Sequence, residues 1–298
     1  MAIKHVIRDI KAFFGVGKLH RKIRTQDYRN ILESEILRTG ERGVSDEHMC
    51  ESEVIISLTT YGNRINTVYL AIASLMRQSM RANRIILWLS EKEFRGGTLP
   101  ATLRLLEKKG LEIKYCRDTR SYKKLIPTLS LYPDAIIITV DDDAIYDFEL
   151  VDRLVRAHIS EPTTVWGNRV HRMSIDKKGN IAPYKKWRSA VPMEESELNF
   201  ATGVGGILYP PHIFLPEILD ESKFMTLAPT ADDIWFKAME LKSGVKVKRI
   251  PPHTADGTDD HLGGIVKFSD GLAGENVSHG RNDLTIKALK EYFDLLPR

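Results

Sequence analysis

The chain has 298 residues, of which 42% are hydrophobic, so it can bury a large core and is not disordered as a whole. Its 44 Lys and Arg residues against 40 Asp and Glu residues give a formal charge of +4, too small to indicate nucleic-acid binding. No apolar run is long enough to cross a membrane or to form a signal peptide. Two cysteines without metal-binding spacing favour a reducing compartment, so we expect a cytoplasmic protein.

The first 25 residues form a basic amphipathic segment. Apolar residues from Ile3 to Phe14 recur at helical spacing, and the basic residues face a single acid, Asp9. Such a helix fits the anionic inner face of the cytoplasmic membrane as a peripheral contact, and it fits equally well against the domain or a second subunit of a homodimer. The expected organisation is an arm and linker over residues 1–50 and a domain over residues 51–298.

From Glu51 onward, strand-like and helix-like apolar spacing alternate along the chain. The predicted strands are Val54–Thr59, Arg84–Leu89, Leu111–Tyr115 and Ala135–Val140. The predicted helices are Ile65–Met80, Pro100–Lys109, Ser121–Leu131, Phe148–His158, a helix capped by Thr230 and stopped by Gly244, and Asn282–Leu295. This alternation predicts an α/β fold with a mostly parallel sheet flanked by helices.

Two polar stretches follow predicted strands, where such sheets bind their ligands. One is TTYGNR, in which the turn formers Gly62 and Asn63 leave backbone amides and Arg64 available to a ligand. The other is the triple acid in AIIITVDDDAIYD. Alternate residues of an extended chain point to the same side, so Asp141 and Asp143 can share one Mg²⁺ or Mn²⁺ ion. The alternative is an acid-rich exposed turn.

Six motifs, taken in order, resemble those of bacterial glycosyltransferases of the GT-A fold, and in the first half those of family 2. They are ISLTTYGNRI, ASLMRQS, SYKKL, the strand ending in DDD, TGVGGILYPP and ADDIWF. The resemblance covers Glu51 to Arg249 and is close to transferases of capsule and lipopolysaccharide biosynthesis. It implies a Rossmann-like domain that binds a nucleotide sugar together with Mn²⁺ or Mg²⁺.

The resemblance also implies roles for the residues that match its motifs. Asp143 would be the principal metal ligand, Asp141 would lie near the metal or the ribose, and Asp142 would belong to the nucleotide-sugar site. Further nucleotide contacts are expected in the loop after the first strand, from Thr59, Tyr61 and Arg64.

Asp118 resembles the acid that hydrogen-bonds a uracil-type base, which favours a UDP-sugar as donor. Lys123 or Lys124 would then approach the base or the phosphates, and a solvated helix face is the alternative for both lysines. A close approach of the backbone to the donor sugar is expected at three glycines, Gly203, Gly205 and Gly206.

The ADDIWF segment resembles the acid pair that supplies the base in inverting GT-A enzymes. Asp233 is the expected base, with Asp232 as the second choice, and the alternative is that both acids only complement a helix N-terminus. Trp235 is expected to stack on an acceptor sugar or to belong to the core. His279, in NVSHGRND, is the expected further metal ligand, against the alternative of a surface histidine.

The predicted function is metal-dependent transfer of a sugar from a nucleotide sugar to a saccharide or a lipid-linked saccharide. The absence of a QxxRW motif favours transfer of a single sugar over polymer synthesis. A haloacid-dehalogenase-like phosphatase is disfavoured because Ile145 stands where its motif needs Thr or Val. A sugar nucleotidyltransferase is disfavoured because TTYGNR is not the Gly-rich first loop with Arg and Lys that such an enzyme needs. A retaining GT-A transferase and a non-catalytic scaffold at the membrane surface remain as alternatives.

Overall fold

A seven-stranded sheet forms the centre of the computed structural model, which describes residues 26–36, 40–252, 261–262 and 280–293. The strand order is β11-β6-β10-β4-β1-β2-β3, and β10 is antiparallel to both of its neighbours while all other neighbours are parallel. This confirms the predicted α/β fold with a mostly parallel sheet. Its strands are β1 (Val54–Thr59), β2 (Arg84–Ser90), β3 (Leu111–Cys116), β4 (Ile136–Thr139), β6 (Val165–Gly167), β10 (Ile207–Tyr209) and β11 (Val247–Arg249).

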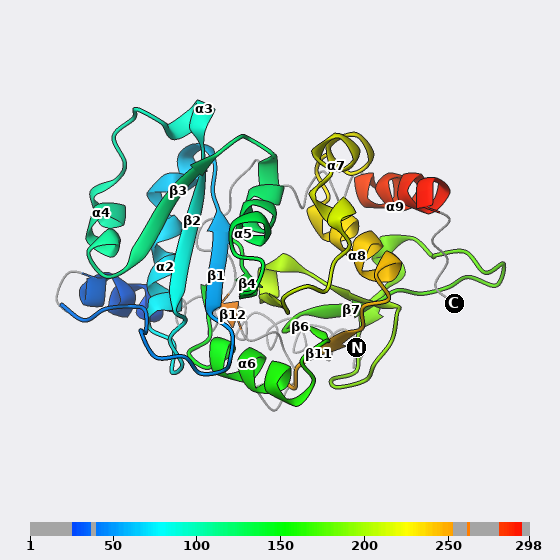
Figure 1. Ribbon diagram of the computed structural model, residues 1–298, viewed down its shortest axis with the longest axis horizontal. Helices are drawn as coiled ribbons and strands as arrows, with labels where there is room; N and C mark the ends of the chain where they lie inside the picture. The colour runs from blue at the N-terminus through cyan, green and yellow to red at the C-terminus, as the bar shows by residue number, and fades with distance from the viewer. Residues whose placement is uncertain (1–25, 37–39, 253–260, 263–279, 294–298) are drawn as a thin grey trace, which may run out of the picture.

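Helices cover both faces of this sheet (Figure 1). The α-helices are α2 (Val68–Met76), α3 (Glu91–Phe94), α4 (Ala101–Glu107), α5 (Ile126–Leu131), α6 (Leu150–Ser160), α7 (Glu221–Leu227), α8 (Asp232–Lys242) and α9 (Arg281–Phe293). Short 3-10 helices are η1 (Gly62–Asn66), η2 (Arg120–Lys124), η3 (Tyr184–Lys186), η4 (Gly203–Gly205) and η5 (Pro216–Leu219).

The alternation of side chains along the strands explains why both faces need cover. On β1, Val54 and Ile56 join the hydrophobic cluster that contains α2, α4 and α6, whereas Ile55 points to the other face. On β4, Ile137 joins the second cluster, which contains α7, α8 and α9. Strands buried on both faces read as nearly continuous apolar runs, which is the pattern IIIT of β4.

Two smaller sheets stand beside the central one. Antiparallel β5 (Ile145–Tyr146) and β12 (His261–Leu262) form a pair, and three further strands form a sheet in the order β8-β7-β9. The strands of the latter are β7 (Val170–Arg172), β8 (Arg188–Ser189) and β9 (Asn199–Ala201). No helix in the described part of the chain is long and apolar enough to cross a membrane.

Residues 26–36, the described part of the predicted arm, form a helix that packs on the domain. Leu32 and Ile36 of this helix are buried in the same cluster as α2 and α4, and Val44 of the following segment joins them. The described residues before Glu51 therefore share the core of the domain. The first 25 residues, which carry the predicted amphipathic pattern, lie outside the described residues, and so does His279.

Several predicted boundaries shift by a few residues. The predicted helix Ile65–Met80 is divided into η1 and α2, and Ser121–Leu131 is divided into η2 and α5. Thr230 does not cap α8, because the N-cap is Ala231 without a side-chain hydrogen bond. Gly244 does follow the end of that helix with a φ of +67°, as the expected stop signal requires.

Candidate functional site

The predicted site residues meet at one edge of the sheet because of strand direction. The loops after β1, β3 and β4 lie at the carboxyl ends of parallel strands, and they carry Arg64, Lys124 and Asp141. Antiparallel β10 begins at this edge, so the glycines of η4 lie there too. The helix α8 returns to parallel β11, and Asp232 and Asp233 at its N-terminus complete the group.

Asp142 turns inward and binds protein groups. Its carboxylate accepts hydrogen bonds from Thr60 Oγ1 and from Arg64, each at 2.6 Å, and the residue is only 6% exposed. Burial raises the pKa of Asp142 to about 6, although the charge of Arg64 acts in the opposite direction. The expected contact of Asp142 with the nucleotide is therefore replaced by an internal one, in which the carboxylate fixes the position of Arg64.

Asp141 and Asp143 are less buried than Asp142 and keep about a third of their side chains exposed, 32% and 30%. Asp141 lies 3.2 Å from Lys124 Nζ, and Asp143 lies 3.2 Å from Arg64. Burial and the nearby charge of Asp141 raise the pKa of Asp143, while Arg64 opposes the shift. Asp142 and Asp143 lie in a turn after β4, so the extended geometry expected for the triple acid is wrong, although Asp141 and Asp143 do stay partly exposed while Asp142 is buried.

These two carboxylates fit a divalent cation that keeps open coordination positions. Within the described residues there is no cluster of three or more His, Cys, Asp or Glu side chains that would enclose a metal ion. One or two carboxylates completed by water and phosphate oxygens is the usual arrangement for Mg²⁺ bound with a nucleotide. Asp141 and Asp143 would hold such an ion, and a contribution from His279 falls outside the described residues.

Lys124 joins the two groups of acids. Its Nζ lies 3.2 Å from Asp141, 2.9 Å from Asp232 and 3.7 Å from Asp233, and the residue is 5% exposed. Although burial opposes its charge, these carboxylates raise the pKa of Lys124 well above its ordinary value. Lys124 is therefore a buried cation shared by three carboxylates, and the alternative of a solvated helix face does not hold.

Lys123 is buried as well and pairs with Asp118 at 2.5 Å. The backbone amide of Arg120 also donates to Asp118, at 3.1 Å. Burial opposes the charge of Asp118, but Lys123 and this amide lower the pKa of its carboxyl group. Asp118 stays half-exposed beside the site, so its expected role toward a nucleotide base stays a prediction.

The acid pair at the start of α8 has two different environments. Asp232 accepts a hydrogen bond from Ser121 Oγ at 2.9 Å and pairs with Lys124, and it is almost fully buried. Asp233 is 26% exposed and accepts a hydrogen bond from the backbone amide of Gly203 at 3.1 Å. Burial raises the pKa of Asp233 to about 7, against the opposing charge of Lys124 and together with the like charge of Asp232.

The glycines of TGVGG have different neighbours. A Cβ atom on Gly203 would lie 2.5 Å from Lys124 Nζ and 2.9 Å from Asp141, so a side chain there would displace the Lys124 amine or the Asp141 carboxylate. Gly205 packs against Arg169, and Gly206, with a φ of +90°, packs against Leu150. The close approach expected at all three glycines is thus found at Gly203, whereas Gly205 and Gly206 serve the packing of the chain.

Three aromatic and hydroxyl residues have internal partners. Thr59 Oγ1 donates to the carbonyl oxygen of Trp88 at 2.8 Å, and the Tyr61 ring lies 5.0 Å from the guanidinium of Arg64. Trp235 has no exposed surface, donates to the carbonyl of Ile218, and packs against other aromatic rings of α7 and α9. The expectation that Trp235 stacks on an acceptor is wrong, because the indole lies in the core.

Sequence reasoning missed three residues that orient the acids. Thr60 and Ser121 bind Asp142 and Asp232, and both lie inside motifs that had been singled out, TTYGNR and SYKKL. The buried Tyr146 hydroxyl accepts from the backbone amide of Asp141 at 2.7 Å and donates to its carbonyl at 3.2 Å. The signal for Tyr146 was its place directly after the acids, in an apolar segment that cannot solvate a hydroxyl.

Comparison with known proteins gives only distant likenesses. Neither a protein-family model nor a curated protein matches this chain. The mannosyltransferase PcManGT from Pyrobaculum calidifontis, in complex with GDP-Man and Mn2+, is 12% identical with a TM-score of 0.45, over 93% of this chain and 84% of that one. A CMP:2-keto-3-deoxy-manno-octonic acid synthetase complexed with CTP is 13% identical with a TM-score of 0.39, over 70% and 93%. Such values assign no activity or ligand to this chain.

Proposed function

We propose that this protein is a metal-dependent glycosyltransferase of the GT-A type that uses a nucleotide sugar, with a UDP-sugar favoured, as donor. The observation that supports it is the meeting of Asp141, from the triple acid, with the acid pair Asp232 and Asp233 around the buried amine of Lys124. One group suits a cation and a diphosphate, and the other suits proton transfer. If Lys124 formed only a structural salt bridge, one acidic partner would be enough, and the space beside it at Gly203 would not be needed.

In this proposal the donor diphosphate lies at the carboxyl end of β4. Asp141 and Asp143 would hold a divalent cation there, and that cation would neutralise charge on the departing diphosphate. Arg64 is fixed by Asp142 at the same edge and supplies a further positive charge. Because Lys124 contacts both Asp141 and Asp233, it would fix the position of the proposed base relative to the bound donor.

Asp233 is the proposed base. Its pKa of about 7 suits a carboxylate that takes a proton near neutral pH, and the amide of Gly203 orients the carboxyl group. The acceptor hydroxyl would give its proton to Asp233 while its oxygen forms a bond to the anomeric carbon. The bond from that carbon to the diphosphate breaks in the same step, and the diphosphate leaves with the electron pair. The product then has inverted configuration.

The decisive experiment is a calorimetric titration of the protein with UDP in the presence and absence of Mn²⁺. We expect binding that requires the metal, and a screen of UDP-sugars with Mn²⁺ should then show slow donor hydrolysis. A protein that binds neither UDP nor other nucleoside diphosphates with Mn²⁺ contradicts the proposal and favours the non-catalytic scaffold. Product of retained configuration would instead assign the retaining mechanism and remove the role of Asp233 as base.

A further inference from the structure

The sheet β8-β7-β9 and its connecting loops carry an excess of positive charge. Between Arg169 and Ala190 the sequence has seven basic residues and one acid, Asp176, although the whole chain has 44 basic residues against 40 acids. The seven are Arg169, Arg172, Lys177, Lys178, Lys185, Lys186 and Arg188. The nearly neutral chain therefore concentrates positive charge on this one segment.

Most of these charges are exposed and lack an acidic partner. Five residues of the segment are exposed and, among the described residues, have no carboxylate within salt-bridge distance: Lys177, Lys178, Lys185, Lys186 and Arg188. The carboxylate of Asp176 binds the backbone amides of Lys178 and Asn180 at 2.8 and 2.9 Å. Of the acids that follow the segment, Glu194 pairs with Arg172 of the segment itself and Glu195 pairs with Lys246, so neither neutralises the five exposed residues. The surface is therefore positively charged.

This basic sheet is continuous with the proposed catalytic site. Val170 of β7 pairs with Ala201 of β9, and the next amide, that of Thr202, donates to the carbonyl of Arg169 at 3.1 Å. The following amide, that of Gly203, donates to Asp233. The strand β9 therefore leads directly from the basic sheet to the residue that binds the proposed base.

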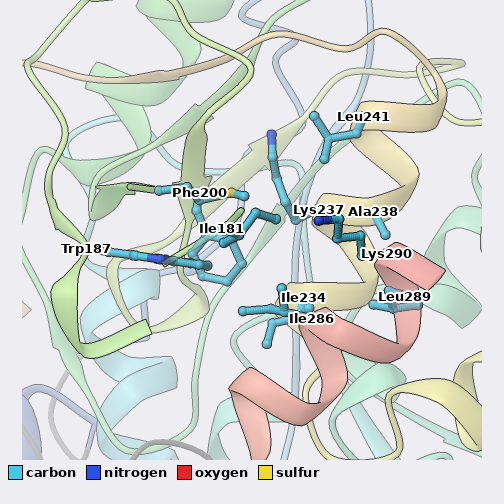
Figure 2. A pocket seen from close by; sticks show the side chains of 11 residues that line it. Ile181, Trp187, Phe200, Ile234, Lys237, Ala238, Leu241, Ile286, Leu289 and Lys290 are labelled. Carbon is cyan, nitrogen blue, oxygen red and sulfur yellow. The ribbon is translucent and has the colours of Figure 1, made fainter. Parts of the chain in front are cut away.

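Aromatic rings hold the sheet against the helix that carries Asp233. The ring of Tyr184 lies 4.7 Å from that of Trp187 and 5.9 Å from that of Phe200. Trp187 and Phe200 line a small apolar pocket against Ile234 of α8 and residues of α9 (Figure 2). Burial raises the pKa of Tyr184 to about 12, and the charge of Asp233 acts in the same direction, in agreement with a position near that carboxylate. Tyr184 is half-buried and directly precedes the exposed residues Lys185 and Lys186 in the chain.

We propose that this sheet binds the acceptor and that the acceptor is an anionic saccharide, with carboxylate or phosphate groups along its chain. The inference rests on the proposed function, because it takes Asp233 as the base. Exposed lysines supply the charge complementarity, and the ring of Tyr184 offers an apolar face to a sugar ring. The continuity with Asp233 favours a saccharide over a lipid surface, which would need no path to the base.

The test compares binding of an oligogalacturonate with binding of a neutral dextran of equal length. Wild-type protein should bind the oligogalacturonate with an affinity that falls as salt rises, and it should bind dextran far more weakly. The double variant Lys185→Glu/Lys186→Glu should bind the oligogalacturonate about tenfold more weakly, since each exposed ion pair contributes little alone. The matched control, Lys92→Glu/Lys108→Glu, has the same change in charge at exposed residues of α3 and the α4 end and should keep wild-type affinity.

A further variant, a lipid ligand and a UDP control distinguish saccharide recognition from simple charge attraction and from membrane binding. Tyr184→Leu keeps the charge and the apolar packing and should also weaken binding of the oligogalacturonate, which a purely electrostatic attraction does not predict. Equal loss in the control variant, or equal binding of dextran, would overturn the proposal. A third result would also overturn the proposal: the protein binds vesicles of phosphatidylglycerol and phosphatidylcholine through Lys185 and Lys186 but does not bind the oligogalacturonate. Mn²⁺-dependent UDP binding should be the same in all these variants, and its absence in wild type would point to failure of the proposed function itself.

Discussion

Neighbouring aspartates in the triple acid have opposite environments. Asp142 is buried between Thr60 and Arg64, whereas Asp143 keeps 30% of its side chain exposed. The difference follows from the turn at Asp142 and Asp143, which places Asp142 against Thr60 and Arg64 and leaves Asp143 partly exposed. In the proposed function, the motif therefore combines a structural acid, Asp142, with acids that would bind a ligand.

Alanine substitutions should separate these functions. Asp142→Ala leaves Arg64 buried without its main partner, and we expect the free energy of unfolding to fall by about 2 to 3 kcal/mol, with weaker UDP binding as well. Asp143→Ala should change stability by less than about 1 kcal/mol, because its ion pair is partly exposed. It should nevertheless abolish Mn²⁺-dependent binding of UDP. Denaturant titration and calorimetry measure the two effects, and equal behaviour of the two variants would contradict the division.

The proposed base has its own test at the scale of one residue. Asp233→Asn should retain UDP binding and lower the rate of transfer by about 100- to 10,000-fold. Because a base acts in its deprotonated form, the rate of the wild-type enzyme should fall as the pH drops below about 7, the pKa of Asp233. The residual activity of the variant should not show this acid limb. Transfer close to the wild-type rate would remove Asp233 from the chemistry.

At the scale of elements, packing decides whether the helix of residues 26–36 belongs to the domain or to a separate arm. Its sequence lies in a region that was expected to be an arm, but Leu32 is 1% exposed and belongs to the main cluster. The adjacent Ile31 is 43% exposed on the same helix. One apolar residue of the pair therefore contributes to the core, and the other does not.

These two residues provide a matched pair of variants. Leu32→Ala should lower the free energy of unfolding by about 2 to 5 kcal/mol, because it leaves a cavity among α2 and its neighbours. Ile31→Ala has a similar loss of side chain at an exposed position and should change stability by less than about 0.5 kcal/mol. Thermal or denaturant unfolding measures both. Similar small effects would mean that the helix is not part of the cooperative unit.

For the whole molecule, both faces of one sheet are covered, so the stability of the fold depends on groups far from the site. His158 lies near the end of α6, buried, and its Nδ1 has no hydrogen-bond partner among the described residues. Burial lowers the pKa of His158 below its ordinary value of 6.5. The folded protein therefore binds a proton at this position less readily than the unfolded chain does.

This shift predicts a loss of stability in acid. Above pH 6.5 the histidine is neutral in both states and contributes nothing, and as the pH falls below 6.5 the unfolded chain takes up the proton first, which lowers stability. His158→Gln removes the titration, so its free energy of unfolding should fall less between pH 7 and pH 5 than that of wild type. Denaturant titrations across this range check the sign, and parallel curves would contradict it.

The pattern of apolar residues was sufficient to predict most elements of the sheet. The predicted strand Val54–Thr59 has the same bounds in the structure, and the strand before the triple acid differs from β4 only at its ends. Helix boundaries were less accurate, because a 3-10 turn such as η2 has nearly the same apolar spacing as an α-helix. The prediction that Thr230 caps α8 was wrong, because the helix begins one residue later and its N-cap is Ala231.

The sequence by itself determined the α/β class and the set of acids, since apolar spacing is a local property and the alternation of strands with helices favours parallel strands, whose carboxyl ends meet at one edge. Only the tertiary structure decided which acids are buried and which stay partly exposed, that Gly205 packs too closely on Arg169 for a side chain, and that Trp235 is core. It also brought Lys124 between acids that are far apart in the chain. The physical reason is that burial and charge pairing depend on neighbours distant in sequence, and these neighbours are set by packing of the whole domain.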